Sequence, residues 1–95
     1  MNEGLVIGTV FLVAGIILFL FPPKQINHIY GYRTSNSMRN KENWQKANRY
    51  SSILLMIFGI FLLLFALIVK SIIFTLIMLS VSIALIFILV EMKIS

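Results

Sequence analysis

The sequence predicts an all-α membrane protein with three transmembrane helices and a structured cytoplasmic loop between the first two. Two observations predict this fold class. Hydrophobic residues make up 60% of the chain and charged residues only 12%, whereas a soluble domain carries about 25% charged residues. The apolar residues also gather in three long runs, and most of the charges lie between the first run and the second. A chain of 95 residues is expected to form one domain.

Each uncharged run is long enough to predict a membrane helix. A helix needs roughly 20 residues to cross the hydrocarbon core, and the shorter runs reach that length with their flanks. We expect the first helix to be retained rather than cleaved as a signal peptide, because Glu3 and no Lys or Arg precedes it. The uncharged runs are residues 5–21, 53–69 and 71–90.

The last two runs require a turn between them. As one helix, residues 53–90 would reach about 57 Å, nearly twice the core thickness of about 30 Å. The turn is expected near Lys70–Ser71, where the only charge of this region lies. The predicted helices therefore cover about residues 5–21, 40–69 and 71–90.

Small residues recur at intervals of seven in all three predicted helices. Such residues let helices approach closely in lipid, so they predict close helix packing. The spacing leaves open whether the packing is within one chain or between copies in a homo-oligomer. The residues are Gly8 and Gly15, then Ser52, Gly59 and Ala66, then Thr75 and Ser82.

The basic residues predict the orientation. Lys and Arg are enriched in the short cytoplasmic loops of membrane proteins. Only Lys70 lies between the second and third runs, so the 22–52 loop and the C-terminus are predicted to be cytoplasmic and the N-terminus outside. The same charges would attract anionic lipid. The basic residues on the loop side are Lys24, Arg33, Arg39, Lys41, Lys46, Arg49 and Lys93.

The loop has the features of a folded segment rather than a linker. Pro22–Pro23 ends the first helix, and Gly31 allows a turn with positive φ. Residues 34–37 are interpreted as irregular. Either Ser37 or Asn40 is a suitable N-cap for the next helix, which then continues without a breaker into the membrane.

One face of this long helix carries charges and another carries Trp44. The charged face, which includes Glu42 and Lys46 at i, i+4 spacing, is interpreted as solvated. Trp44 precedes Ile53 by about 13–14 Å of helix, too far for a tryptophan of the headgroup belt. Either the helix bends onto the membrane surface or Trp44 packs against the loop; we favour packing. The packing partners available in the loop are Tyr30, Tyr32, Met38 and the stem of Arg33.

The composition offers little for catalysis, and the protein is predicted to be non-enzymatic with no cofactor or metal. Cysteine is absent, His28 is the single histidine, and the three acids are far apart in sequence. Ser37 or Thr34 with His28 would lack a third group to orient the histidine, so His28 is interpreted as an interfacial side chain. The uncharged runs argue against a pump or a transporter.

The loop resembles the signature of the SdpI-type immunity family of bacterial membrane proteins. The resemblance implies one SdpI-like membrane domain over residues 1–95, with motif loop 22–50, in the bacterial plasma membrane. The matching positions are Pro22–Pro23–Lys24, Asn27, Gly31–Tyr32–Arg33–Thr34, Ser37–Met38, Asn40, Trp44 and Ala47–Asn48.

The resemblance implies immunity to a secreted peptide toxin that acts on the membrane, with signalling to a cytoplasmic repressor. Larger members carry a further membrane region ahead of this one, so signalling is the less transferable role. Many members place a glycine where Ser51–Ser52 stand here. The alternative is a lipid- or partner-binding scaffold without a toxin role. The implied functional residues are Asn27, Tyr32, Arg33, Thr34, Ser37, Met38, Asn40, Trp44 and Asn48.

The motif residues allow two physical interpretations. Arg33, Asn40 and a helix N-terminus have the chemistry to hold an anion such as a lipid phosphate or a carboxylate. The same residues would equally serve to hold the loop together.

Overall fold

The computed structural model describes residues 3–27 and 29–94, and these residues form three helices and no strand. All three helices are long and apolar enough to cross a membrane. The predicted all-α fold class with three transmembrane helices is therefore confirmed. The helices are α1 (Glu3–Leu20), α2 (Lys41–Ile68) and α3 (Ile72–Ile94).

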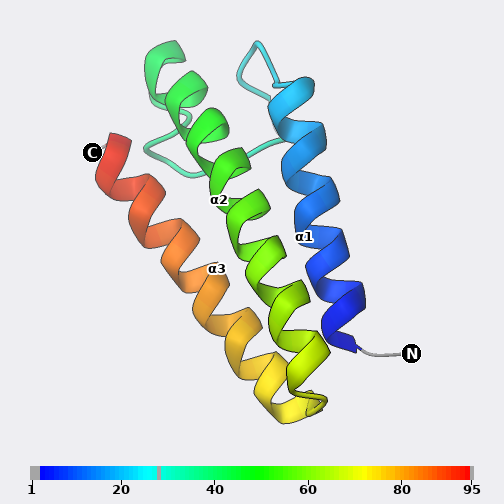
Figure 1. Ribbon diagram of the computed structural model, residues 1–95. Coiled ribbons are helices and arrows are strands. Elements are labelled where there is room, and N and C mark those ends of the chain that lie inside the picture. The colour runs from blue at the N-terminus through cyan, green and yellow to red at the C-terminus, as the bar shows by residue number, and fades with distance from the viewer. Residues whose placement is uncertain (1–2, 28, 95) are drawn as a thin grey trace.

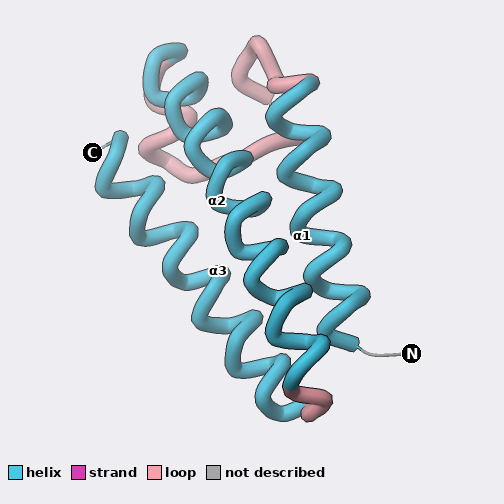
Figure 2. The backbone as a smooth tube through the Cα atoms, viewed as in Figure 1, coloured by secondary structure: helices cyan, strands magenta, loops and turns pink. Residues whose placement is uncertain are grey.

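The three helices lie side by side with α2 in the middle (Figure 1). The turn between α2 and α3 lies at the same end as the start of α1, and the long loop lies at the other end with the C-terminus (Figure 2). At about 1.5 Å per residue, the 28 residues of α2 span about 42 Å. Because the hydrocarbon core is about 30 Å thick, one end of α2 extends beyond it. That end is the one beside the long loop.

Local signals explain where α2 and α3 begin and end. Asn40 has extended backbone angles, and its side chain accepts a hydrogen bond from the Asn43 N–H, so of the two N-caps that the sequence allowed, Ser37 and Asn40, it is Asn40 that caps α2. The helix ends at Val69, whose backbone is extended, and α3 starts directly after Ser71. The predicted turn near Lys70–Ser71 is thus confirmed. At its other end α3 continues to Ile94, beyond the predicted end at residue 90.

Glycines bring α1 and α2 into direct backbone contact. A Cβ atom added to Gly15 would lie 2.8 Å from the Met56 nitrogen and 2.8 Å from the Ser52 carbonyl oxygen. A Cβ atom on Gly59 would lie 2.7 Å from the Leu12 nitrogen. These distances leave no room for a side chain, so any larger residue would push the helices apart. The packing predicted from the small residues is confirmed, and for α1 and α2 it lies within one chain.

The small residues of α3 are also buried, and α3 packs mainly on α2 rather than on α1. Thr75 and Ser82 are buried, and Ile86, Val90 and Ile94 continue the buried side of α3 toward the loop. α1 and α3 meet over only a short stretch. A space between them therefore stays open beside α2, directly under the loop.

Candidate functional site

The loop and the first turns of α2, residues 22–48, form a compact cap at one end of the helices. Its first part is ordered by Asn27, whose side-chain oxygen accepts the N–H groups of Ile29 at 3.0 Å and Tyr30 at 2.7 Å. The Tyr30 hydroxyl then donates to the Phe21 carbonyl at 2.8 Å, which ties the loop to the end of α1. His28, interpreted above as an interfacial side chain, lies outside the described residues.

Gly31 occupies a position that only glycine fits. Its φ angle is +102°, as the predicted turn requires. A Cβ atom here would also collide with the side-chain oxygen of Asn48 and lie 2.8 Å from the Pro23 ring. Gly31 therefore packs directly between Pro23 and the Asn48 side chain of α2, with no space for a larger residue.

Trp44 and Asn48, one turn apart on α2, fix the loop to this helix. Trp44 is fully buried, and its indole N–H donates to the Pro23 carbonyl at 2.7 Å. Asn48 accepts the Tyr32 N–H at 2.6 Å and donates to the Trp44 carbonyl at 2.9 Å. The prediction that Trp44 packs against the loop is confirmed, although its polar partner, Pro23, was not among the residues expected.

The polar run at 34–37 is more ordered than the sequence predicted. The Thr34 N–H donates to the Ser37 hydroxyl at 2.7 Å, and the Ser37 N–H donates to the Thr34 hydroxyl at 3.1 Å. The Met38 N–H closes the turn on the Thr34 carbonyl at 3.0 Å. Ser37 is fully buried in this turn. These paired hydrogen bonds fix the direction in which the Thr34 hydroxyl points.

The turn directs three donors to one carboxylate, that of Glu91 near the end of α3. The Tyr32 hydroxyl donates to it at 2.8 Å, the Thr34 hydroxyl at 2.9 Å and the Asn36 amide at 3.0 Å. Hydrogen bonds to a charged acceptor are stronger than neutral ones. We call this group of four residues the Glu91 clasp, because it fastens the cap to α3.

The surroundings of Tyr32 favour its neutral form. Burial and the hydrogen bond to Glu91 both raise the pKa of the Tyr32 hydroxyl well above its usual range. The phenol, which is protonated at neutral pH even without this shift, therefore remains a donor to Glu91 at a more alkaline pH than an ordinary tyrosine would.

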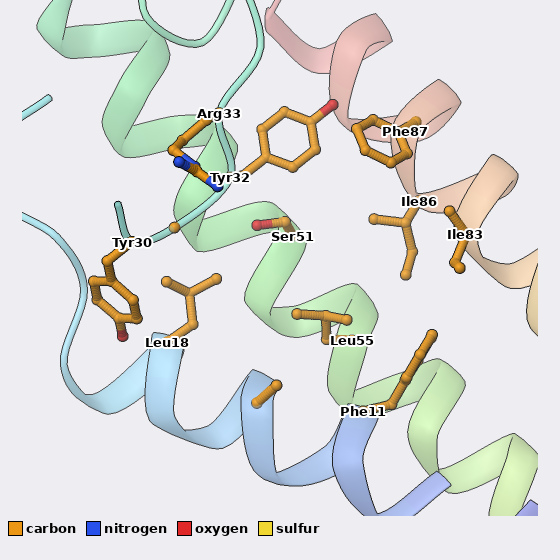
Figure 3. Close-up of a pocket in the computed structure, with 12 residues that line it drawn as sticks. Phe11, Leu18, Tyr30, Tyr32, Arg33, Ser51, Leu55, Ile83, Ile86 and Phe87 are labelled. Carbon is orange, nitrogen blue, oxygen red and sulfur yellow. The ribbon is translucent and has the colours of Figure 1, made fainter. Parts of the chain in front are cut away.

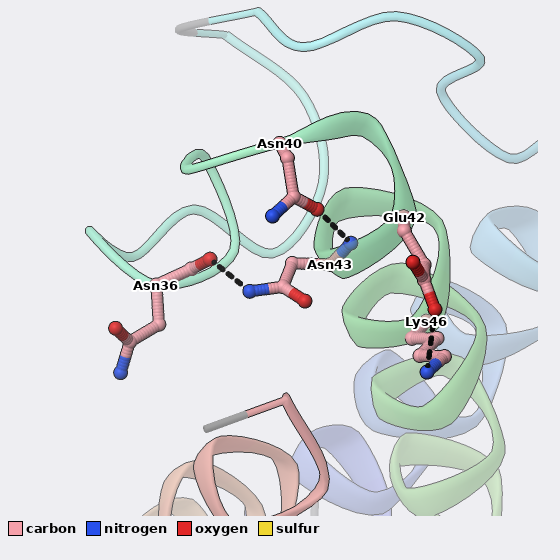
Figure 4. A network of polar contacts seen from close by, with 5 residues as sticks. All are labelled: Asn36, Asn40, Glu42, Asn43 and Lys46. Carbon is pink, nitrogen blue, oxygen red and sulfur yellow. Dashed lines mark hydrogen bonds and ion pairs between the residues drawn. The ribbon is translucent and has the colours of Figure 1, made fainter.

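Further polar contacts join the loop to the first turns of α2 (Figure 4). The Asn36 carbonyl accepts from the Asn43 side chain at 3.0 Å, and the Asn43 N–H donates to Asn40 at 2.8 Å. On the outside of α2, Lys46 forms an ion pair of 3.0 Å with Glu42, and both side chains are mostly exposed. The solvated face predicted for these two residues is confirmed, and such exposed pairs contribute little stability.

A cavity of about 510 Å³ lies under the cap, between α1 and α3. Figure 3 shows Tyr32 and Arg33 at its loop end and Phe11 among the membrane helices. The Tyr32 ring lies 5.4 Å from the Phe87 ring, centroid to centroid, and forms one wall. Because Tyr32 also donates to Glu91, one side chain joins the cavity to the clasp. The lining residues are Phe11, Ala14, Leu18, Tyr30, Gly31, Tyr32, Arg33, Ser51, Leu55, Ile83, Ile86 and Phe87.

The residues singled out in the sequence have two kinds of position. Most of them make hydrogen bonds that build the cap, and Met38 is half-buried beside them. Arg33 is exposed and lines the cavity next to Tyr32. The members that build the cap are Asn27, Tyr32, Thr34, Ser37, Asn40, Trp44 and Asn48.

Sequence reasoning missed Glu91, Asn36 and Asn43. Glu91 was expected only to lie far from the other two acids, and its partners are neutral donors of the loop. A signal was present, because Glu91 is the single acid directly after an uncharged run of membrane length. In the described part of the chain, no three His, Cys, Asp or Glu side chains group as they would around a metal ion.

The comparison with protein families matches most of the cap, the whole of α2 and most of α3. The family model described as the SdpI/YfhL protein family matches residues 24–91, a range that includes the whole Glu91 clasp. A curated relative, "Uncharacterized protein YfhL" of Bacillus subtilis (strain 168), is 51% identical over 57 residues. The match covers 60% of this chain and 52% of the relative, so the chain spans about half of that protein's length. No solved structure matches the chain.

Proposed function

The chain belongs to the SdpI/YfhL protein family, and from this premise we propose that it protects a bacterial cell against a secreted, membrane-active peptide toxin. The protein is a multi-pass membrane protein, so its surroundings are the lipid bilayer. It acts in this proposal by binding and not by catalysis. The toxin, rather than a small substrate, is the ligand.

The observation that carries the proposal is the place of the Gly31–Thr34 segment, the most distinctive part of the matched motif. Three of its residues, Gly31, Tyr32 and Arg33, line the loop end of the 510 Å³ cavity between α1 and α3. Most of the other lining residues are apolar, as in most ligand sites of proteins. A membrane-active peptide carries apolar side chains that fit such a cavity, and it reaches the space between two helices from within the bilayer.

Arg33 gives the cavity a polar end. Its guanidinium offers five donors in a planar fork, a geometry that suits a carboxylate or a row of peptide carbonyls. In the proposed complex, apolar toxin side chains lie against residues such as Phe11 and Leu55, and Arg33 binds the toxin's polar groups. The other motif residues contribute indirectly, because they hold Arg33 and Tyr32 in place.

We also propose that the cap and the C-terminus face the cytoplasm and that the N-terminus lies outside. A toxin bound inside the bilayer would then contact Tyr32 on the cavity side. Displacement of Tyr32 would loosen the Glu91 clasp on the cytoplasmic side. This connection offers a physical route by which a cytoplasmic repressor is informed of the toxin.

The experiment is a challenge of toxin-sensitive cells that express the wild type or one of two bulky variants. Ala14→Phe fills the cavity, whereas Ala84→Phe adds the same ring to an exposed site on α3 that does not line it. We expect wild type and Ala84→Phe to protect, and Ala14→Phe to lose at least about tenfold in surviving cells at equal membrane levels. Full protection by Ala14→Phe would contradict the proposal that the cavity binds the toxin. No protection by wild type would favour a scaffold without a toxin role.

A further inference from the structure

A second pocket, of about 220 Å³, lies outside the cavity and shares no lining residue with it. Lys46, Arg49, Tyr50 and Ile53 of α2 line it, together with Lys93 of α3. Three of these five side chains are cationic, and they come from two different helices. We call this site the basic pocket.

Two of the three cations have no acidic partner among residues 3–27 and 29–94. Lys46 is paired with Glu42 at 3.0 Å. Within residues 3–27 and 29–94, neither Arg49 nor Lys93 takes part in an ion pair. Glu91 is close in sequence to Lys93, but its carboxylate accepts three donors of the cap. The basic pocket therefore keeps a net positive charge.

Aromatic rings hold these two cations in place. The Arg49 guanidinium carbon lies 5.2 Å from the centroid of the Phe19 ring. The Lys93 ammonium lies 5.9 Å from the centroid of the Tyr50 ring. Both distances are typical of cation–π contacts.

The cations also lie at the depth of lipid headgroups. Arg49 precedes Ile53, the start of the uncharged run, by about 6 Å of helix, and Lys93 follows Val90 by about 4.5 Å. Lys41, in contrast, lies about 18 Å before Ile53. Tyrosine is typical of the interface between headgroups and hydrocarbon, and Tyr50 lines the pocket together with Arg49 and Lys93.

An apolar track leads from the pocket into the membrane. Ile53, Ile57 and Ile60 follow at positions i, i+4 and i+7 of α2, so they share one face of the helix. Ile57 and Ile60 are 43% and 48% exposed, so the track is open to lipid. We propose that the basic pocket binds the phosphate headgroup of an anionic phospholipid, whose acyl chain lies along this track. Basic pockets between helix ends bind anionic headgroups in other membrane proteins. This site does not depend on the proposed toxin function.

The test is native mass spectrometry of the detergent-solubilised full chain, titrated with phosphatidylglycerol or phosphatidylcholine. We expect wild type to bind phosphatidylglycerol at least about fivefold more tightly than phosphatidylcholine. Arg49→Gln and Lys93→Gln should each weaken phosphatidylglycerol binding by at least about fivefold, and Lys93→Arg should retain it. The emission of Trp44, which is buried in the cap, checks that each variant is folded.

Lys24→Gln is the matched control, because Lys24 lies just beyond the uncharged run of α1 and does not line the basic pocket. It removes one charge at a similar depth, and we expect less than a twofold change in binding. An equal loss in Lys24→Gln and Lys93→Gln would mean diffuse attraction to anionic lipid and would overturn the site. Equal binding of the two lipids by wild type would overturn it as well.

Discussion

The Tyr32 hydroxyl lies 2.8 Å from the Glu91 carboxylate and donates a hydrogen bond to it, across 59 positions of sequence. Tyr32 is also hydrogen-bonded through its backbone N–H to Asn48 of α2. One residue of the loop is thus fastened to two helices at once. Its ring meanwhile forms a wall of the cavity, so the stability of the cap and the shape of the cavity depend on the same side chain.

Removing the clasp acceptor should open the cap. Glu91→Ala leaves the donors of Tyr32, Thr34 and Asn36 without their acceptor. Each donor that stays buried should lower the free energy of unfolding by about 1–3 kcal/mol. We expect trypsin to cleave the detergent-solubilised variant faster at Arg33 and Arg39, while the helices remain in the micelle. Glu42→Ala is the control, because it removes an exposed ion pair worth less than about 1 kcal/mol. Equal cleavage of the two variants would show that the clasp does not hold the cap.

Two substitutions of Trp44 should separate the contribution of its packing to stability from that of its hydrogen bond. Trp44→Ala removes a fully buried side chain and should cost about 3–5 kcal/mol. Trp44→Phe keeps most of the apolar volume but loses the donor to the Pro23 carbonyl, and we expect a cost of about 1–2 kcal/mol. Limited proteolysis of the loop should therefore be slowest for wild type, intermediate for Phe and fastest for Ala. A Trp44→Ala variant as resistant as wild type would disprove the packed anchor.

Arg33 is the residue with which to separate function from folding. Arg33→Lys keeps the positive charge but loses the planar fork, so we expect normal insertion and expression together with lost toxin protection. Lys41→Ala, an exposed charge on α2 that does not line the cavity, should protect as well as wild type. Protection by Arg33→Lys combined with failure of Lys41→Ala would show that total charge matters and that guanidinium geometry does not.

The proposed orientation is testable because the chain has no cysteine. Ser35 and Lys70 are both exposed and lie at opposite ends of the helices, so Ser35→Cys and Lys70→Cys can be labelled one at a time. An impermeant maleimide should label residue 70 in intact cells and residue 35 only after lysis. The reverse pattern would place the cap and the C-terminus outside the cell.

Features that depend on neighbouring residues were predictable from the sequence. Asn40 was expected to cap a helix and Gly31 to take a positive φ, and both do so because these properties belong to the residue type and its local backbone. The small residues were predictable for a similar reason, since their spacing follows the helical repeat. The turn at Lys70–Ser71 was predictable from the thickness of the hydrocarbon core, because residues 53–90 would be too long as one helix.

Features that depend on the arrangement of the helices were not predictable. Glu91 could be seen as an acid at the end of a membrane run, but its partners depend on how α3 lies against the loop. The Pro23 carbonyl became the partner of Trp44 because the loop folds back over the start of α2. The cavity exists because α1 and α3 meet over only a short stretch. How two helices lie relative to each other cannot be predicted from any single segment of the sequence.

The long sequence separation within the clasp has a consequence for biosynthesis. At about 5–20 residues per second, the ribosome adds Glu91 roughly 3–12 s after Tyr32, so the donors of the cap are made long before their acceptor. During that interval the nascent chain carries Thr34 and Asn36 with no carboxylate to bind. The cap can close only after α3 has been inserted with its Glu91 end beside the loop. A closed cap therefore marks a chain in which α3 has been inserted beside the loop, and a protease that attacks open loops would selectively remove chains in which α3 had not been inserted correctly.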